Sequence, residues 1–137
     1  MARAQLALNV PDLEEAIAFY SKLFATAPAK RRDGYANFAI ADPPLKLVLF
    51  EHAGAETRLN HLGVEVATSD EVRAHQRRLD GEGVASAEGS GTCCFADQEK
   101  VWVDAPDGPW EIYAVLADDD TAHETACDAA AAAPCCA

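Results

Sequence analysis

Residues 5–10 read QLALNV, and residues 61–66, which lie 56 positions further along the chain, read HLGVEV. Both stretches alternate apolar side chains with polar or small ones, a pattern typical of a half-buried β-strand. A helix-capping pattern follows each stretch at the same offset, beginning at Asp12 and at Thr68. A segment that recurs in this way predicts one supersecondary unit used twice.

The segments after each predicted helix continue the repeat. Alternating or apolar runs bounded by Gly, Pro and Asp predict further strands in both halves. The Gly- and Ser-rich segment 89–98 is expected to be a mobile loop, with Gly89 and Gly91 as hinges. The order of elements predicts an α+β fold of two β-α-β-β-β modules. The expected strands are 5–10, 26–31, 35–40 and 45–50 in the first module and 61–66, 84–88, 99–103 and 110–116 in the second.

Composition narrows the class of protein. The chain has 137 residues, half of them hydrophobic, which suits one domain over residues 1–120 with modules at about 3–54 and 59–117. Its net charge of −12 argues against nucleic acid and anionic membranes as partners. The apolar runs are too short to cross a bilayer, and the first residues lack a signal-peptide layout. A cytoplasmic protein is therefore expected.

Residues 121–137 differ from the rest of the chain. They are acidic and alanine-rich, contain neither Lys nor Arg, and hold three of the five cysteines, Cys127, Cys135 and Cys136. Such a composition predicts a disordered tail. Its thiols would collect soft metals, or the tail would be an extension without a role, and the sequence leaves both readings open.

The repeat indicates a metal site. Gln5 and His61 open equivalent strands, and Glu111 lies near the end of the second module. Packing of two similar modules would bring an amide, an imidazole and a carboxylate together, a three-ligand set that leaves open positions on a catalytic metal. The corresponding position of the first module, near Leu47, is apolar, so three protein ligands are expected and not four. The alternative is that each is a polar residue on a half-solvated sheet face.

The adjacent pair Cys93-Cys94 indicates a second kind of site. Neighbouring cysteines form a strained disulfide but suit a soft ion that takes two thiolates, such as trivalent arsenic or cadmium. A trivalent arsenical R–As(OH)2 would exchange both hydroxyls and keep its As–C bond. Lys100 would favour the thiolate form if it lay close. The alternative is two cysteines that are adjacent by chance and are buried as small apolar groups.

These motifs resemble the vicinal oxygen chelate superfamily, which includes glyoxalase I and extradiol dioxygenases. Within it, the chain is similar to the C–As lyases, also known as cadmium-induced proteins. The resemblance covers roughly residues 3–120 and implies a curved mixed sheet around a metal site. It is carried by the segments QLALNVPDLEEAIAFYSKLF, KRRDGYANFAIADPPLKLVLFE, LNHLGVEV, TCCFADQEKVWV and PWEIYAVLAD.

The resemblance implies a non-haem Fe(II) enzyme that uses O2 to cleave the carbon–arsenic bond of methylarsonous acid or trivalent aromatic arsenicals and releases arsenite. By this resemblance Gln5, His61 and Glu111 would hold iron, and Cys93 with Cys94 would hold arsenic. Two alternatives remain: a non-enzymatic cadmium- or arsenite-binding resistance protein, and a glyoxalase-like isomerase or thiol transferase. The sequence is also compatible with a homodimer, because the modules could pair within one chain or between two.

Overall fold

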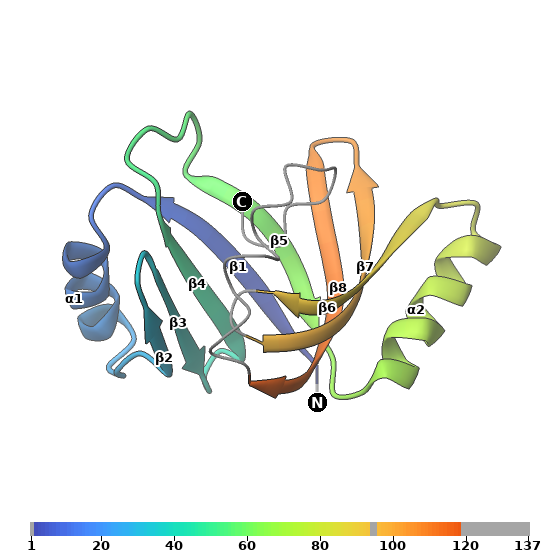
Figure 1. Ribbon diagram of the computed structural model, residues 1–137, viewed down its shortest axis with the longest axis horizontal. Coiled ribbons are helices and arrows are strands. Elements are labelled where there is room, and N and C mark those ends of the chain that lie inside the picture. The colour runs from blue at the N-terminus through green and yellow to red at the C-terminus, as the bar shows by residue number, and fades with distance from the viewer. Residues whose placement is uncertain (1, 94–95, 119–137) are drawn as a thin grey trace. The chain divides into compact units, whose positions relative to one another are not determined.

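The computed structural model describes residues 2–93 and 96–118. Within this part of the chain each module has the order β-α-β-β-β, which confirms the predicted α+β fold (Figure 1). None of the described helices is long and apolar enough to cross a membrane. The elements are β1 (Arg3–Val10), α1 (Leu13–Leu23), β2 (Lys30–Arg32), β3 (Tyr35–Ile40), β4 (Leu45–Glu51), β5 (Leu59–Glu65), α2 (Ser69–Gly81), β6 (Ser86–Cys93), β7 (Ala96–Ala105) and β8 (Gly108–Asp118).

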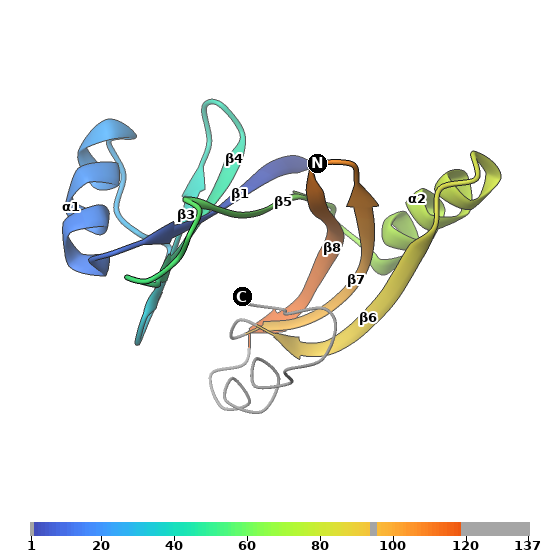
Figure 2. The same ribbon diagram turned by 90° about the horizontal axis from the view of Figure 1, so that it is seen from above.

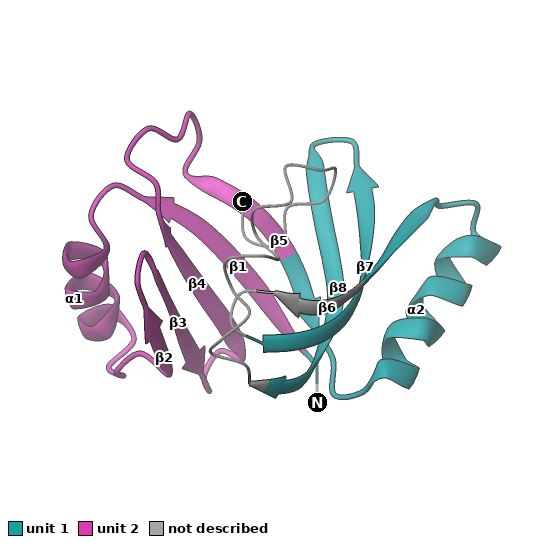
Figure 3. Ribbon diagram, in the orientation of Figure 1, with its two compact units in different colours: residues 1–2, 63–137 teal, residues 3–62 magenta. Residues whose placement is uncertain are grey.

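The strands are hydrogen-bonded in the order β2-β3-β4-β1-β5-β8-β7-β6. The sheet is mixed, because β1 pairs parallel to β4 whereas the neighbours β3/β4 and β7/β8 are antiparallel. The chain divides into two compact units, shown in different colours in Figure 3. Residues 3–62 form the unit called N-terminal here, and residues 63–137 with 1–2 form the C-terminal unit.

In the N-terminal unit, α1 packs on the face of the strands that carries Leu8 and Val10 (Figures 1 and 2). The helix begins where two carboxylates accept free backbone N–H groups, Asp12 from Glu15 at 3.0 Å and Glu51 from Leu13 at 2.8 Å. The predicted short edge strand is present, but at Lys30–Arg32. The buried core consists of Leu8, Val10, Leu13, Ile17, Ala36, Phe38, Ile40, Leu47 and Leu49.

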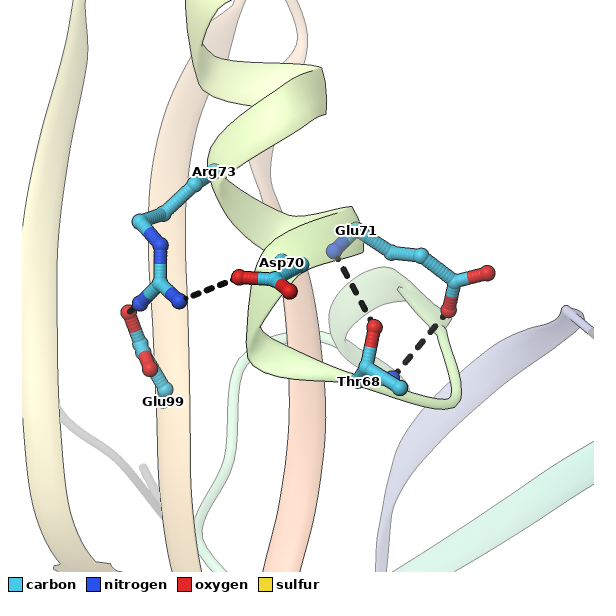
Figure 4. Close-up of polar contacts among 5 residues, drawn as sticks. All are labelled: Thr68, Asp70, Glu71, Arg73 and Glu99. Carbon is cyan, nitrogen blue, oxygen red and sulfur yellow. Dashed lines mark hydrogen bonds and ion pairs between the residues drawn. The ribbon is translucent and has the colours of Figure 1, made fainter.

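In the C-terminal unit, α2 begins with the predicted capping box. The Thr68 hydroxyl accepts from the Glu71 backbone N–H at 3.2 Å, and a Glu71 carboxylate oxygen accepts from the Thr68 backbone N–H at 3.1 Å (Figure 4). Apolar residues of α2, β7 and β8, with one from the end of β5 and one just after it, then form a second core. Its buried members are Val66, Val72, Val101, Ile112 and Ala114, with Val64 and Leu79 packed against them.

An ion-pair cluster joins the first turns of α2 to β7. The Arg73 guanidinium donates to Asp70 at 2.6 Å and to Glu99 at 2.7 Å (Figure 4). The hydrogen bond to Asp70 is the largest cause of the raised pKa of Arg73. The pKa of Glu99 is lowered, chiefly by a hydrogen bond from the Ser69 side chain and also by Arg73. These groups are accessible to solvent, so the cluster orients the helix more than it stabilises the unit.

The prediction of a loop over 89–98 is wrong wherever the structure describes that segment. Residues 89–93 complete β6 and residues 96–98 begin β7, and these strands pair antiparallel. Gly89 lies opposite Lys100, and an added Cβ would lie 3.2 Å from Lys100 Cγ. Gly89 therefore provides room for the lysine stem and is not a hinge. Residues 94 and 95 lie outside the described part of the chain.

Candidate metal site

Two of the predicted ligands meet in the N-terminal unit. Gln5 is the third residue of β1 and His61 is the third residue of β5, so both project from the same position of equivalent strands. Their side chains are buried, with 5% and 4% of their surface exposed. Gln5 Nε2 lies 3.2 Å from His61 Nε2. The equivalence that the repeat predicted thus brings an amide and an imidazole into direct contact.

The opposite ring nitrogen of His61 is held by a chain of amides. His61 Nδ1 lies 2.7 Å from Asn60 Oδ1. Asn60 Nδ2 donates to Asn9 Oδ1 at 3.0 Å, and Asn9 Nδ2 donates to the backbone carbonyl of Thr57 at 3.1 Å. This series, called the amide relay below, lies entirely within the N-terminal unit. Its last member, Asn60, contacts the ring nitrogen opposite the one that Gln5 contacts.

The outer end of the amide relay lies at the surface. Asn9 and Thr57 line a pocket of about 570 Å³ that is formed by the start of α1 and the segment between β4 and β5. Aromatic and acidic side chains share this pocket, among them Tyr20 and Glu56. The relay therefore extends from a buried imidazole to an open pocket.

The third predicted ligand, Glu111, belongs to the C-terminal unit and is 3% exposed. Its carboxylate accepts a hydrogen bond from the ammonium group of Lys100 at 3.0 Å, and both side chains are buried. The ammonium also lies over the rings of Trp102 and Tyr113, at 5.6 and 5.8 Å from their centroids. Burial of the carboxylate is tolerated because a cation compensates its charge.

The predicted arsenic ligands cannot be placed in the same way. Cys93 ends β6 with its backbone paired to Ala96, and its side chain is not described. Cys94 and the tail cysteines Cys127, Cys135 and Cys136 lie outside the described residues. Binding of arsenic by Cys93 and Cys94 stays a prediction, and so does an effect of Lys100 on a thiol.

The N-terminal unit offers an amide and an imidazole as candidate metal ligands. Over residues 2–93 and 96–118, no group of three His, Cys, Asp or Glu side chains is placed to hold a metal ion. Gln5 therefore matters as the partner that already contacts His61. Amide oxygens are accepted ligands of divalent ions, although they are weaker donors than imidazole.

Comparison with known proteins decides the family. A family model for the glyoxalase/bleomycin resistance protein/dioxygenase superfamily matches residues 3–112. The chain belongs to this superfamily. The matched range includes β1, β5 and the first part of β8, and thus the strand positions of Gln5, His61 and Glu111.

Two relatives within the superfamily are identical to this chain at more than half of the aligned positions. A protein named trivalent organoarsenical cleaving enzyme, from Thermomonospora curvata, is 56% identical over 99% of this chain and 100% of its own length. The cadmium-induced protein CadI of Mycobacterium bovis is 61% identical over 88% of this chain and 81% of its own length. These matches confirm the resemblance found in the sequence. The solved structure of the 2,3-dioxygenase LapB from Pseudomonas sp. KL28 shares the superfamily fold, with a TM-score of 0.64, 22% identity, and coverage of 87% of this chain and 43% of that one.

Three contacts were not anticipated from the sequence: that of Asn60 with His61, that of Asn9 with Asn60, and that of Lys100 with Glu111. The signal for Lys100 was available, because the turn at 106–108 sets the register of the β7–β8 hairpin. Lys100 pairs with Tyr113, and Glu111 lies two residues from that tyrosine on the same face, a diagonal cross-strand position. The link between Asn60 and Asn9 joins positions 51 residues apart and had no such signal.

Proposed function

We propose that this protein cleaves the carbon–arsenic bond of trivalent organoarsenicals, such as methylarsonous acid or trivalent aromatic arsenicals, and releases arsenite with the help of Fe(II) and O2. The observation that carries the proposal is the 56% identity, over essentially the whole of both chains, to a protein named for that cleavage. The buried contact between Gln5 and His61 places two of the residues that would hold the metal side by side.

The residues present fit a non-haem iron site. Gln5 would bind through its amide oxygen, His61 through a ring nitrogen and Glu111 through its carboxylate. Each of the three side chains is nearly inaccessible to solvent. Three ligands leave positions open for O2 and substrate. When bound there, Fe(II) would supply the redox chemistry that lets O2 react with the organic group.

The protein's own residues would bind and orient the substrate. The Cys93 and Cys94 thiols would replace the two hydroxyls of R–As(OH)2, releasing two waters and leaving the As–C bond intact. Fixing arsenic in this way would hold the carbon in one place relative to the metal ligands, and such positioning lowers a barrier by up to about 7–11 kcal/mol in ideal systems. The atoms balance for methylarsonous acid and one O2 if arsenous acid and formaldehyde leave.

A second candidate function has its own support. The chain is 61% identical to a protein named as cadmium-induced, and the alternative we weigh is soft-metal binding without turnover. The vicinal thiols suit such a role, because trivalent arsenic and cadmium both accept thiolates. The buried Gln5–His61 contact has no task in a protein that binds only through thiols.

The test is turnover under controlled oxygen. The chain is loaded with Fe(II) without oxygen, methylarsonous acid is added, O2 is then admitted, and arsenite release is followed over time. Arsenite that appears only with both Fe(II) and O2 supports the lyase. Tight binding of the arsenical without release leaves the soft-metal binder and rejects the lyase.

A matched pair of variants tests the thiol assignment. Cys93→Ser should abolish binding of the arsenical and leave Fe(II) binding intact. Cys127→Ser, which removes a tail thiol of the same chemistry, should retain both. Full turnover by Cys93→Ser would show that arsenic is not held by the vicinal pair.

A further inference from the structure

The amide relay has a direction, and its direction is set by a backbone atom. The carbonyl oxygen of Thr57 can only accept a hydrogen bond, so the Asn9 side-chain atom 3.1 Å away must be its amide nitrogen. Asn9 then presents its oxygen to Asn60, whose amide nitrogen donates at 3.0 Å. Asn60 in turn presents its oxygen to His61 Nδ1 at 2.7 Å. At each hydrogen bond, the role of one amide fixes which atom of the next side chain donates and which accepts.

The opposite direction fails at the backbone. It would require the Asn9 side-chain oxygen to face the Thr57 carbonyl oxygen, so that two acceptors would meet with no hydrogen between them. Asn9 is further held in place because its backbone N–H donates to the Arg58 carbonyl at 2.8 Å. The carbonyl at the outer end therefore decides the state of a ring that is three hydrogen bonds away.

We infer that Asn60 and Asn9 are positioning residues that hold His61 in the tautomer with hydrogen on Nδ1 and the lone pair on Nε2. An oxygen acceptor 2.7 Å from Nδ1 requires a hydrogen on that nitrogen. In a neutral imidazole the lone pair then lies on Nε2, the atom that contacts Gln5 Nε2 at 3.2 Å. Only the further statement that Nε2 binds iron rests on the proposed function.

The inference gives a role to each hydrogen-bonding group that surrounds the buried His61 ring. With this tautomer Gln5 Nε2 would donate to the Nε2 lone pair 3.2 Å away, and a metal ion would accept the same lone pair. Groups that hold the second nitrogen of a metal-binding histidine change metal affinity by about 10–100-fold when they are removed. The relay would thus prepare His61 for a metal before one arrives.

The test reads the tautomer directly in the metal-free chain. Two-bond ¹H–¹⁵N NMR distinguishes protonated from unprotonated ring nitrogens, and His61→Gln identifies the resonances of His61. The native chain should show hydrogen on Nδ1. Asn60→Ala should move it to Nε2, in whole or in part, because the acceptor at Nδ1 is lost. Asn60→Asp keeps an acceptor and should keep the native tautomer.

A matched control separates the relay from general disturbance of the segment. Thr57→Val removes the hydroxyl but leaves the backbone carbonyl on which the relay ends, so His61 should keep hydrogen on Nδ1. Asn9→Ala removes the link to that carbonyl and should produce a mixture of tautomers. This variant replaces Asn60→Ala if the latter fails to fold by circular dichroism.

Metal affinity supplies the second measurement. Fe(II) titration without oxygen should give a Kd about 10–100-fold weaker for Asn60→Ala than for the native chain. Hydrogen on Nε2 in the native chain, or an unchanged tautomer in both alanine variants, would overturn the inference. Failure of carbon–arsenic cleavage would leave the NMR result standing, so the two proposals fail separately.

Discussion

Replacing Lys100 by methionine tests the strongest electrostatic feature of the C-terminal unit. The substitution keeps a long unbranched side chain but removes the ammonium group that Glu111 accepts from at 3.0 Å. Both side chains are only 4% exposed, so water cannot take the place of the lost cation. Lys100→Met therefore removes the cation that compensates the buried Glu111 carboxylate.

The magnitude follows from the geometry. Two unit charges 3.0 Å apart attract by about 5–6 kcal/mol at an effective dielectric constant of about 20. Removing one partner of a buried pair costs about 3–5 kcal/mol in practice, because the remaining charge stays desolvated. For a chain of this size, that loss lowers the Tm by roughly 10–20 °C.

Urea unfolding at neutral pH measures the change in the free energy of unfolding. Arg31→Met is the matched control, because it removes a cation whose ion pair with Glu14 is exposed, and it should cost only about 0–1 kcal/mol. The double variant Lys100→Met/Glu111→Leu should recover most of the loss, since it removes both charges. A cost for Lys100→Met no larger than that of Arg31→Met would refute the reasoning.

Three further predictions concern the C-terminal unit. Thr68→Ala removes the hydroxyl that caps α2 and should lower the free energy of unfolding by about 1 kcal/mol in urea titrations. Gly89→Ala should cost about 1 kcal/mol, measured in the same way, because the new Cβ would lie 3.2 Å from Lys100 Cγ. The lowered pKa of Glu99 stabilises the fold above its ordinary value of 4.5, and this contribution disappears as the pH falls. Unfolding curves against pH should therefore show native and Glu99→Gln chains converging below pH 4.5; a gap that widens on acidification would contradict this sign.

The fold could be predicted because the strand and helix-cap patterns of the two modules agree with each other. Strand alternation and two helix caps recur at the same spacing, and β3 occupies residues 35–40 as predicted. The segment 89–93 was misread because glycine and serine favour turns when only neighbours in sequence are considered. Its state depends on pairing with β7, and on Gly89 leaving room for the Lys100 stem. Pairing of this kind is tertiary and outweighs local preference.

The candidate metal ligands could be predicted from the sequence, whereas the amides that hydrogen-bond to His61 and to each other could not. Gln5 and His61 could be paired because the repeat makes their strands equivalent. Asn9 and Asn60 could not be linked to His61, because amide contacts depend on side-chain rotamers and on a carbonyl in the segment before β5. Sequence periodicity records which face of a strand a residue occupies, and it carries no information about the direction of a hydrogen bond.

The amide relay also has a consequence for proton movement. Proton hopping along a hydrogen-bonded chain requires every member to receive a proton on one side and release one on the other, as water and hydroxyl groups do. The side-chain amides of Asn9 and Asn60 are neither acidic nor basic enough to do so near neutral pH. Solvent in the pocket lined by Asn9 and Thr57 is thus connected to His61 by hydrogen bonds and yet cannot exchange protons with it by this route. The relay therefore orients His61 without giving solvent in this pocket a path for proton transfer to the ring.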